Sequence, residues 1–289
     1  MGMFPIERKY MNVVVGIDIG GSTTKIAGFD NGELLQSVQV KANSPVASLF
    51  GAFGQFLLEN KLNLQDIAEI RLTGVGSSSI EQPIYGIPTY QVDEFVADGV
   101  GGRYFSKGEK IVVVSMGTGT TYVLVDGEKL THLGGIAIGG GTIMGLSRLM
   151  LNTEDVDTIQ EMSLKGDVGN IDLRIGDIST KPLPGLDLDI TAANFANVAP
   201  NVSKEDVAAG IVHMVLENIC HTGTLIARSH GVEEFILIGS LAYFDECGPI
   251  SASCANMEGG NVHFVIPEAC GFGTAIGAAL AQAKDCVQI

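Results

Sequence analysis

Hydrophobic positions at the start of the chain form short strand-like runs separated by glycine. Val13 to Asp18 is an apolar, largely β-branched run, which predicts a buried strand. Gly20-Gly21-Ser22 interrupts this run, and Thr23 to Phe29 resumes a strand composition. Asn31-Gly32 supplies the positive-φ pair of a tight hairpin, and Glu33 to Val40 alternates as a third strand. The pattern predicts strand, glycine turn, strand, hairpin and strand.

The same order of elements returns about a hundred residues later. Its parts are the run Ile111 to Ser115, the turn Met116-Gly117-Thr118-Gly119, the run Thr120 to Val125, the hairpin Asp126-Gly127 and the run Glu128 to Leu133. We interpret this recurrence as an internal duplication of one supersecondary unit.

Helical periodicity fills the regions between these runs. Ser44-Pro45 is a suitable N-cap and first-turn pair. Apolar residues then recur with helical spacing, at Val46, Leu49, Phe50, Phe53, Phe56 and Leu57. Ser203 with Asp206 predicts a capping box before a helix from about Lys204 to Ser229, and Phe235 to Ile238 predicts a buried strand that ends at Gly239-Ser240. Strands that alternate with helices indicate an α/β protein.

Length and composition indicate a globular protein with two domains. The chain has 289 residues, of which 46% are hydrophobic and 17% charged, and domains hold roughly 150 residues each. We expect a flexible extension at residues 1–10, an N-terminal domain at 11–110 and a C-terminal domain at 111–289. The 17 basic and 33 acidic residues give a net charge of −16. This charge disfavours nucleic acid and an anionic membrane surface as partners.

Mean hydropathy is +0.30, yet no membrane-spanning helix is predicted. The long uncharged run at residues 42–58 contains Asn, Ser, Gln and Pro. Glu7, Arg8 and Lys9 lie where a secretory signal would have its apolar stretch, which predicts a cytoplasmic location. The five cysteines include no CxxC pair, so we expect reduced thiols and neither a disulfide framework nor a zinc site.

Glycine is concentrated in loops that suit an anion. The chain has 38 glycines, about twice the usual share of roughly 7%. In the first loop, glycine lets backbone N–H groups point at a phosphate, while hydroxyls and a lysine add donors and charge. Its expected ligand residues are Gly20, Gly21, Ser22, Thr23, Thr24 and Lys25. The loop lacks the GK[ST] ending of a Walker loop, and a strand follows where a dinucleotide fingerprint needs a helix.

Two further loops repeat this chemistry. Gly117-Thr118-Gly119 is the equivalent turn of the second unit, and the two hairpins together would clamp a polyphosphate. Gly139-Gly140-Gly141-Thr142 precedes a segment of helical composition, Ile143 to Leu151, so we expect an anion site made by orphan N–H groups and the helix dipole. The alternative for any one loop is an ordinary tight turn. Three such loops in this order favour nucleotide binding.

These residues resemble a known family. From Met11 onward the chain is similar to the actin-like ATPase superfamily of sugar and acid kinases, and within it to type II pantothenate kinases. The resemblance rests on Gly16 to Gly21 with Lys25, Gly117 to Thr120, Gly139 to Gly141, Gly166-Asp167, Ile171 to Leu173 and Thr191-Ala192-Ala193-Asn194-Phe195. The glycine loops are general to the superfamily, whereas the last motif is specific to pantothenate kinases.

The resemblance implies a duplicated, ribonuclease H-like fold of two domains with the nucleotide in an interdomain cleft, and a homodimer. It implies ATP and Mg²⁺ as cofactors and pantothenate as the small-molecule substrate, phosphorylated in the first step of coenzyme A synthesis. By this resemblance Asp18 lies near Mg²⁺, Lys25 meets the transferring phosphate and Ser240 lies near the adenosine. Nucleotide contacts are implied at Thr118, Gly140, Gly141, Thr142, Ile143 and Met144, and acceptor contacts at Thr118, Thr121 and His132.

Glu94 is the expected catalytic carboxylate. Phosphoryl transfer rests on positioning and charge stabilisation, with one carboxylate that orients or deprotonates the acceptor hydroxyl. Glu94 matches the family's catalytic glutamate, and its place just after Ile87 to Tyr90 suits a strand end that opens on a cleft. Spacing alone leaves open that Asp93 and Glu94 are solvated surface acids.

His132 departs from the family pattern. Most relatives have arginine two residues before the Gly-Gly that opens the third glycine loop, here Gly134-Gly135, where the arginine helps to hold the acceptor. A histidine is shorter and not permanently charged. The alternative is that His132 ends a hairpin and has no role. Two other functions also remain open at this point. One is a kinase for a sugar or another small hydroxyl compound. The other is an ATP-driven activator, for which only Cys270-Gly271 superficially resembles a glycine-flanked cluster ligand.

Overall fold

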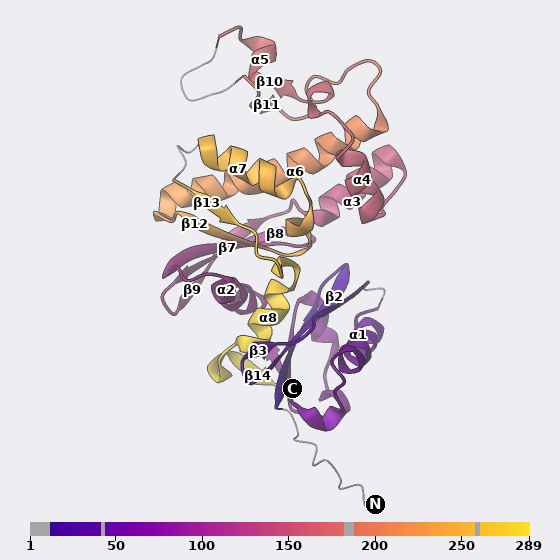
Figure 1. Cartoon of the computed structure of the whole chain (residues 1–289), viewed down its shortest axis with the longest axis vertical. Coiled ribbons are helices and arrows are strands. Elements are labelled where there is room, and N and C mark those ends of the chain that lie inside the picture. The colour runs from indigo at the N-terminus through magenta and orange to yellow at the C-terminus, as the bar shows by residue number, and fades with distance from the viewer. Residues whose placement is uncertain (1–11, 42–43, 182–187, 258–260) are drawn as a thin grey trace, which may run out of the picture. The chain divides into compact units, whose positions relative to one another are not determined.

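The computed structural model describes residues 12–41, 44–181, 188–257 and 261–289 (Figure 1). The expected extension at residues 1–10 lies outside these ranges. The chain forms two compact units. Unit 1 comprises Met1–Tyr104 and Phe272–Ile289, and unit 2 comprises Phe105–Gly271. This division differs from the predicted ranges 11–110 and 111–289 mainly at the C-terminus, where the last segment adds a helix and an edge strand to unit 1.

Unit 1 is built on a mixed seven-stranded sheet in the order β14-β6-β5-β1-β2-β3, with β4 also paired to β2. Its strands are β1 (Val13–Ile19), β2 (Thr23–Asp30), β3 (Glu33–Leu34), β4 (Val38–Lys41), β5 (Ile67–Thr73), β6 (Thr89–Val92) and β14 (Cys286–Gln288). Its helices are α1 (Pro45–Glu59), α2 (Glu94–Phe105) and α8 (Gly273–Leu280). The pairs β1/β5 and β5/β6 are parallel, so their carboxyl ends share one edge.

The third strand predicted at residues 33–40 is wrong as a single element. It is divided into β3 and β4, because the backbone of Gln36 bonds to Asn60 at the end of α1: Gln36 N donates to Asn60 Oδ1 (3.0 Å), and Gln36 O accepts from Asn60 Nδ2 (2.9 Å). The start of α1 follows the prediction, although the Ser44 side chain makes no capping bond.

Unit 2 repeats the topology with the order β13-β12-β7-β8-β9. Its strands are β7 (Lys110–Met116), β8 (Thr120–Asp126), β9 (Lys129–Ile136), β12 (Glu234–Ile238) and β13 (His263–Val265), with a separate pair β10 (Leu173–Arg174) and β11 (Thr191–Ala193). Its helices are α3 (Gly140–Leu151), α4 (Val156–Ser163), α5 (Ile175–Ile178), α6 (Lys204–His230) and α7 (Cys247–Met257). The two units share one pattern. In each, the first strand (β1 or β7) pairs with an antiparallel strand on one side (β2 or β8) and with a parallel strand on the other (β5 or β12), as the predicted duplication requires.

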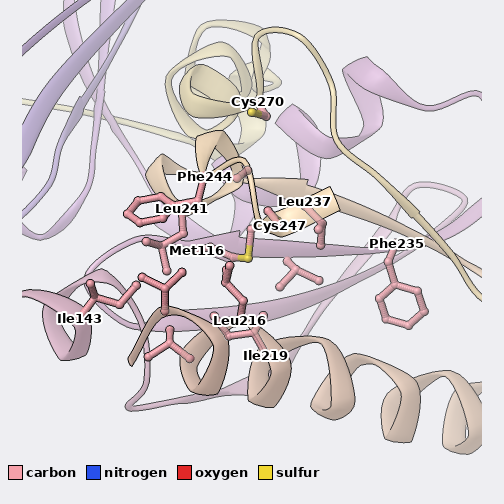
Figure 2. Close-up of a cluster of buried hydrophobic side chains, with 14 of the residues drawn as sticks. Met116, Ile143, Leu216, Ile219, Phe235, Leu237, Leu241, Phe244, Cys247 and Cys270 are labelled. Carbon is pink, nitrogen blue, oxygen red and sulfur yellow. The ribbon is translucent and has the colours of Figure 1, made fainter. Parts of the chain in front are cut away.

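Each sheet has a core of large aliphatic and aromatic side chains. In unit 2, Leu216 and Ile219 of α6 pack toward strand residues such as Met116, Phe235 and Leu237 (Figure 2). The predicted capping box starts α6, since Asp206 N donates to Ser203 Oγ (3.0 Å) and Ser203 N to Asp206 Oδ2 (3.1 Å). Across the described ranges, no helix combines the length and apolar character needed to cross a membrane.

Candidate functional site

Three strand ends place polar side chains at one edge of the unit 1 sheet. Asp18 is the penultimate residue of β1, Thr73 is the last residue of β5, and Glu94 follows β6 as the first residue of α2. Asp18 pairs in register with Thr73 on the parallel strand and with Lys25 on β2. Carboxyl ends of parallel strands are common ligand sites in α/β proteins.

The Asp18 carboxylate lies close to Gly74, a position that only glycine can occupy. A Cβ at Gly74 would fall 2.5 Å from Asp18 Oδ1 and 2.7 Å from Ile19 O, and Gly74 has φ +83°. Burial raises the pKa of Asp18 to about 6, while Lys25 acts to lower it and Glu94 to raise it further. Burial and the neighbouring carboxylate thus disfavour the negative charge, and a bound cation would relieve both effects.

Asp18 therefore makes stability depend on pH in a defined direction. We expect Asp18→Asn to stabilise the metal-free protein at pH 8 but not at pH 4. Because the folded pKa is about 6 and the ordinary value 3.8, the folded state binds the proton more tightly, and stability falls as pH rises between these values. The gain in the variant should reach about 1 to 3 kcal/mol above pH 6. Urea unfolding at pH 4, 5, 6, 7 and 8 measures this gain, and a gain that shrinks with rising pH would contradict this assignment.

Glu94 is fixed by the start of α2. Asp93 caps this helix, since its Oδ1 accepts hydrogen bonds from Phe95 N (2.9 Å) and Val96 N (3.3 Å). Asp93 is exposed and Glu94 half-buried. Burial raises the pKa of Glu94, and the Asp93 charge raises it further. The two neighbouring acids thus have different tasks, since Asp93 holds the helix and Glu94 remains available to a ligand.

Glycines let α2 and α8 pack backbone against backbone. A Cβ at Gly277 would lie 1.8 Å from Ala97 O, and one at Gly101 would lie 2.0 Å from Gly273 O. Beside these contacts the Thr274 hydroxyl donates to the buried Asp98 carboxylate (2.7 Å). These interactions hold the helix that begins with Glu94. The sequence analysis missed them, and the spacing of small residues in both segments is the signal that could have found them.

Glu94 also borders a cavity of about 370 Å³ within unit 1. The wall is formed by the segment after β5, the segment from β6 into α2, and the C-terminal strand. Its lining residues are Gly74, Val75, Ser77, Gln91, Val92, Asp93, Glu94, Asp285 and Val287. The volume lies in the range of small-molecule sites.

The first glycine loop is only partly as predicted. Gly20 N donates to Thr23 O (3.0 Å), which closes the tight turn. Gly21 and Ser22 are exposed and Lys25 is buried. Thr24 is also buried, and its hydroxyl shares a 2.8 Å hydrogen bond with Ser48 Oγ. The expected use of the Thr24 hydroxyl as a phosphate donor is therefore not supported, because that hydroxyl faces α1.

The second and third glycine loops, which both lie in unit 2, are joined by hydrogen bonds. Gly140 N donates to Gly117 O (2.8 Å), and Gly141 N donates to Thr118 O (2.9 Å). The next two N–H groups, of Thr142 and Ile143, donate to Gly139 O (3.0 and 3.2 Å). The predicted orphan N–H groups at this helix start are wrong for these four residues. The turn at residues 117–119 instead holds the start of α3 in place, and the predicted nucleotide contacts of Gly140 to Met144 stay a prediction.

Other predicted residues of unit 2 lie near this turn or on its strands. Ser240 follows β12, whose last residue pairs with Ser115 on β7, and a Cβ at Gly239 would lie 2.5 Å from Met116 O. Ser240 is thereby placed beside the turn that starts at Gly117. Thr121 lies half-buried on β8, and His132 lies exposed on β9 opposite Val123.

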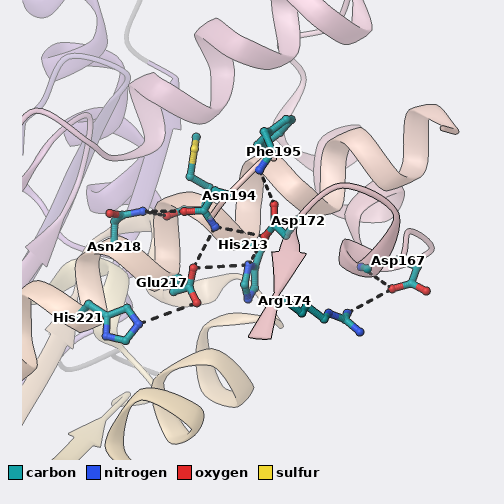
Figure 3. Close-up of polar contacts among 11 residues, drawn as sticks. Asp167, Asp172, Arg174, Asn194, Phe195, His213, Glu217, Asn218 and His221 are labelled. Carbon is teal, nitrogen blue, oxygen red and sulfur yellow. Dashed lines mark hydrogen bonds and ion pairs between the residues drawn. The ribbon is translucent and has the colours of Figure 1, made fainter. Parts of the chain in front are cut away.

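Two of the motifs that carry the resemblance, Ile171 to Leu173 and Thr191 to Phe195, meet side chains of α6 in one polar network (Figure 3). Asn194 Nδ2 donates to Asp172 Oδ2 (3.2 Å) and Glu217 Oε2 (3.0 Å), while Phe195 N donates to Asp172 Oδ1 (2.8 Å). His213 Nδ1 lies 3.2 Å from Asp172 Oδ2. Burial acts to raise the pKa of Asp172, but the hydrogen bonds from His213, Phe195 and Asn194 outweigh it and hold that pKa below its ordinary value.

A second link fixes the neighbouring motif. Asp167 N donates to Asp206 Oδ1 (2.8 Å), and a Cβ at Gly166 would lie 2.1 Å from Glu205 O. These contacts therefore hold the segments at residues 166–172 and 194–195 against α6.

Sequence comparison decides the family. The Fumble family model matches residues 102–281. A type II pantothenate kinase of Bacillus cereus (strain G9842) is 30% identical over 239 residues, covering 80% of this chain and 84% of that protein. One from Bacillus anthracis is 30% identical over 244 residues, covering 80% and 83%. The chain belongs to the type II pantothenate kinase family.

Solved structures agree on the fold of this type II pantothenate kinase family member. The activator of the 2-hydroxyisocaproyl-CoA dehydratase from Clostridium difficile, with bound ADPNP, matches with a TM-score of 0.66 at 17% identity, covering 93% of each chain. A ROK family glucokinase from Streptomyces griseus, in complex with glucose and AMPPNP, matches with a TM-score of 0.57 at 14% identity, covering 93% of this chain and 98% of that one. The predicted actin-like ATPase fold is confirmed.

Proposed function

We propose that the protein transfers the γ-phosphoryl group of ATP to pantothenate, giving 4′-phosphopantothenate, the first step of coenzyme A synthesis. The observation that carries this proposal is the pair Asp18 and Glu94 at the carboxyl edge of one sheet, in a chain of the pantothenate kinase family. We further propose that it acts as a cytoplasmic homodimer, as the family resemblance implies.

The donor set at Asp18 suits Mg²⁺. Within the described ranges, no cluster of three or more His, Cys, Asp or Glu could hold a metal ion. Mg²⁺ needs no such cluster, because it is usually held by one or two carboxylates, substrate phosphates and water. Asp18 would be the protein's ligand, with Lys25 beside it for the transferring phosphate. Bound Mg²⁺ would neutralise phosphate charge during transfer.

Glu94 would act on the acceptor. Its raised pKa brings the carboxyl closer to the range in which it can accept a proton and pass it on. We assign it to orient the acceptor hydroxyl and to take its proton as the oxygen attacks the phosphorus. Asp98 and Thr274 hold α2 and so keep Glu94 in position. The nucleotide would be bound by the loops of unit 2 around Thr118, Gly119 and Ser240.

An ADP-release assay tests this function directly. Pantothenate, its amides and common sugars would each be offered with ATP and Mg²⁺. ADP release with pantothenate supports the proposal. ADP release only with a sugar would show that the protein is a sugar kinase instead. If none of the acceptors gave ADP release, the kinase assignment would be removed. Cys270 does not support an activator role, which would need it as a cluster ligand, because this residue is 1% exposed and buried in the core of unit 2.

His132 should weaken acceptor binding relative to an arginine. A neutral imidazole N–H forms a weaker bond to a carbonyl or carboxylate than a guanidinium does. We expect His132→Arg to lower the pantothenate KM about five- to thirtyfold while leaving the ATP KM unchanged. Because His132 is exposed on a strand, the larger side chain should not disturb the fold. An unchanged pantothenate KM would remove His132 from the acceptor site.

A further inference from the structure

Thr73 carries a polar atom that the fold leaves unused. The residue is 0% exposed, and in the described part of the chain its Oγ1 has no hydrogen-bond partner. A buried hydroxyl without a partner is destabilising, and most proteins avoid it. Since neither water nor a ligand can reach this atom directly, only a neighbouring protein group can satisfy it.

The neighbour on the same sheet face is Asp18. The two residues are register partners on the parallel strands β1 and β5, and such partners project to one face about 4.8 Å apart. Two residues earlier on these strands, the register partners are Gly16 and Arg71, and both face α8. A Cβ at Gly16 would lie 2.0 Å from Ala275 O. Arg71 Nη1 donates to Ala279 O (2.8 Å). Side chains return to the same face every second residue, so Asp18 and Thr73 share the α8 face.

The carboxylate also bends toward the β5 end. Its Oδ1 lies over Gly74, the residue directly after Thr73. The hydroxyl and the carboxylate therefore lie on adjacent strands at the same end of the sheet. We propose that Thr73 is a positioning residue, whose hydroxyl donates a hydrogen bond to Asp18 when this carboxylate binds the cation of the nucleotide. This inference rests on the proposed function, in which Asp18 meets Mg²⁺.

The proposal predicts opposite effects of one substitution on the empty and the loaded protein. Thr73→Val keeps the shape and removes the hydroxyl. Without metal or nucleotide it should raise the melting temperature by about 2 to 4 °C, because an unsatisfied buried group is lost. With a non-hydrolysable ATP analogue it should raise the Mg²⁺ concentration for half-maximal stabilisation about tenfold, because a bond to a charged group is lost. Thr73→Ser should restore the wild-type Mg²⁺ dependence.

Ser147 supplies the matched control. It lies on α3 in unit 2, is 0% exposed, and its hydroxyl also has no partner in the described structure. Ser147→Ala should raise the melting temperature of the empty protein and leave the Mg²⁺ dependence unchanged. A Thr73→Val protein with wild-type Mg²⁺ dependence, or one that melts lower when empty, would overturn the proposal. Failure of the wild type to respond to Mg²⁺ and the analogue would instead overturn the proposed function.

Discussion

Glu94→Gln should lower turnover by about 10²-fold or more, the usual contribution of a positioned proton acceptor. Glutamine keeps the shape of the side chain at the start of α2 but cannot take a proton from the acceptor hydroxyl. ATP binding should survive, because Glu94 is assigned to the acceptor hydroxyl and not to the nucleotide or its Mg²⁺. Steady-state kinetics with pantothenate gives the turnover, and the ATP-dependent rise in melting temperature gives the binding.

Asp93→Asn is the matched control for this substitution. It removes a neighbouring carboxylate, yet asparagine caps helices about as well as aspartate. The two bonds that Asp93 Oδ1 accepts from Phe95 N and Val96 N can therefore persist. Activity of this variant should stay near that of the wild type. Equal losses in both variants, or full activity in Glu94→Gln, would remove Glu94 from the mechanism.

The parts of the fold that the sequence predicted are those with local causes. The strand runs around Gly20-Gly21 and Gly117 to Gly119 follow from β-branched composition, and the start of α6 follows from a capping box that spans four residues. The split of the third strand was not predictable in this way. Its cause is Asn60, which lies more than twenty residues away.

Helices α2 and α8 were missed because their sequences argue against helix. α2 contains three glycines and α8 contains two, and each glycine costs a helix about 1 kcal/mol relative to alanine. Tertiary packing overrides this cost, since these glycines permit the close backbone contacts at Ala97 and Gly273. The position of Glu94 depends on that packing, so its sequence context alone could not decide between catalysis and a surface acid.

The candidate site shows the same limit. Its members Asp18, Thr73 and Glu94 are separated by 55 and 21 positions, and only the order of parallel strands brings them to one edge. The anion site expected at Gly140 and Gly141 was wrong in its donors, because a sequence shows that a helix starts there but not that carbonyls of another loop accept its N–H groups.

Gly119→Val should abolish stabilisation by ATP while leaving the empty protein intact. A Cβ at Gly119 would meet only Ile136 O, at 3.4 Å, so the fold has room for a side chain. That side chain would occupy the approach to the backbone of the proposed nucleotide turn.

At an ATP concentration 100 times the dissociation constant, the free energy of unfolding of the wild type should rise by about 2.7 kcal/mol. The variant should show no rise that thermal denaturation can measure. Gly139→Ala separates binding from folding, because its Cβ would lie 2.6 Å from Thr118 O and 2.8 Å from Gly119 Cα, so this variant should melt lower even when empty. Gly51→Val, on α1 with open space around it, should keep the full ATP response. If Gly119→Val also kept the full ATP response, the turn at residues 117–119 would not bind the nucleotide. The turn would then serve only to hold the start of α3 through its hydrogen bonds with Gly140 and Gly141.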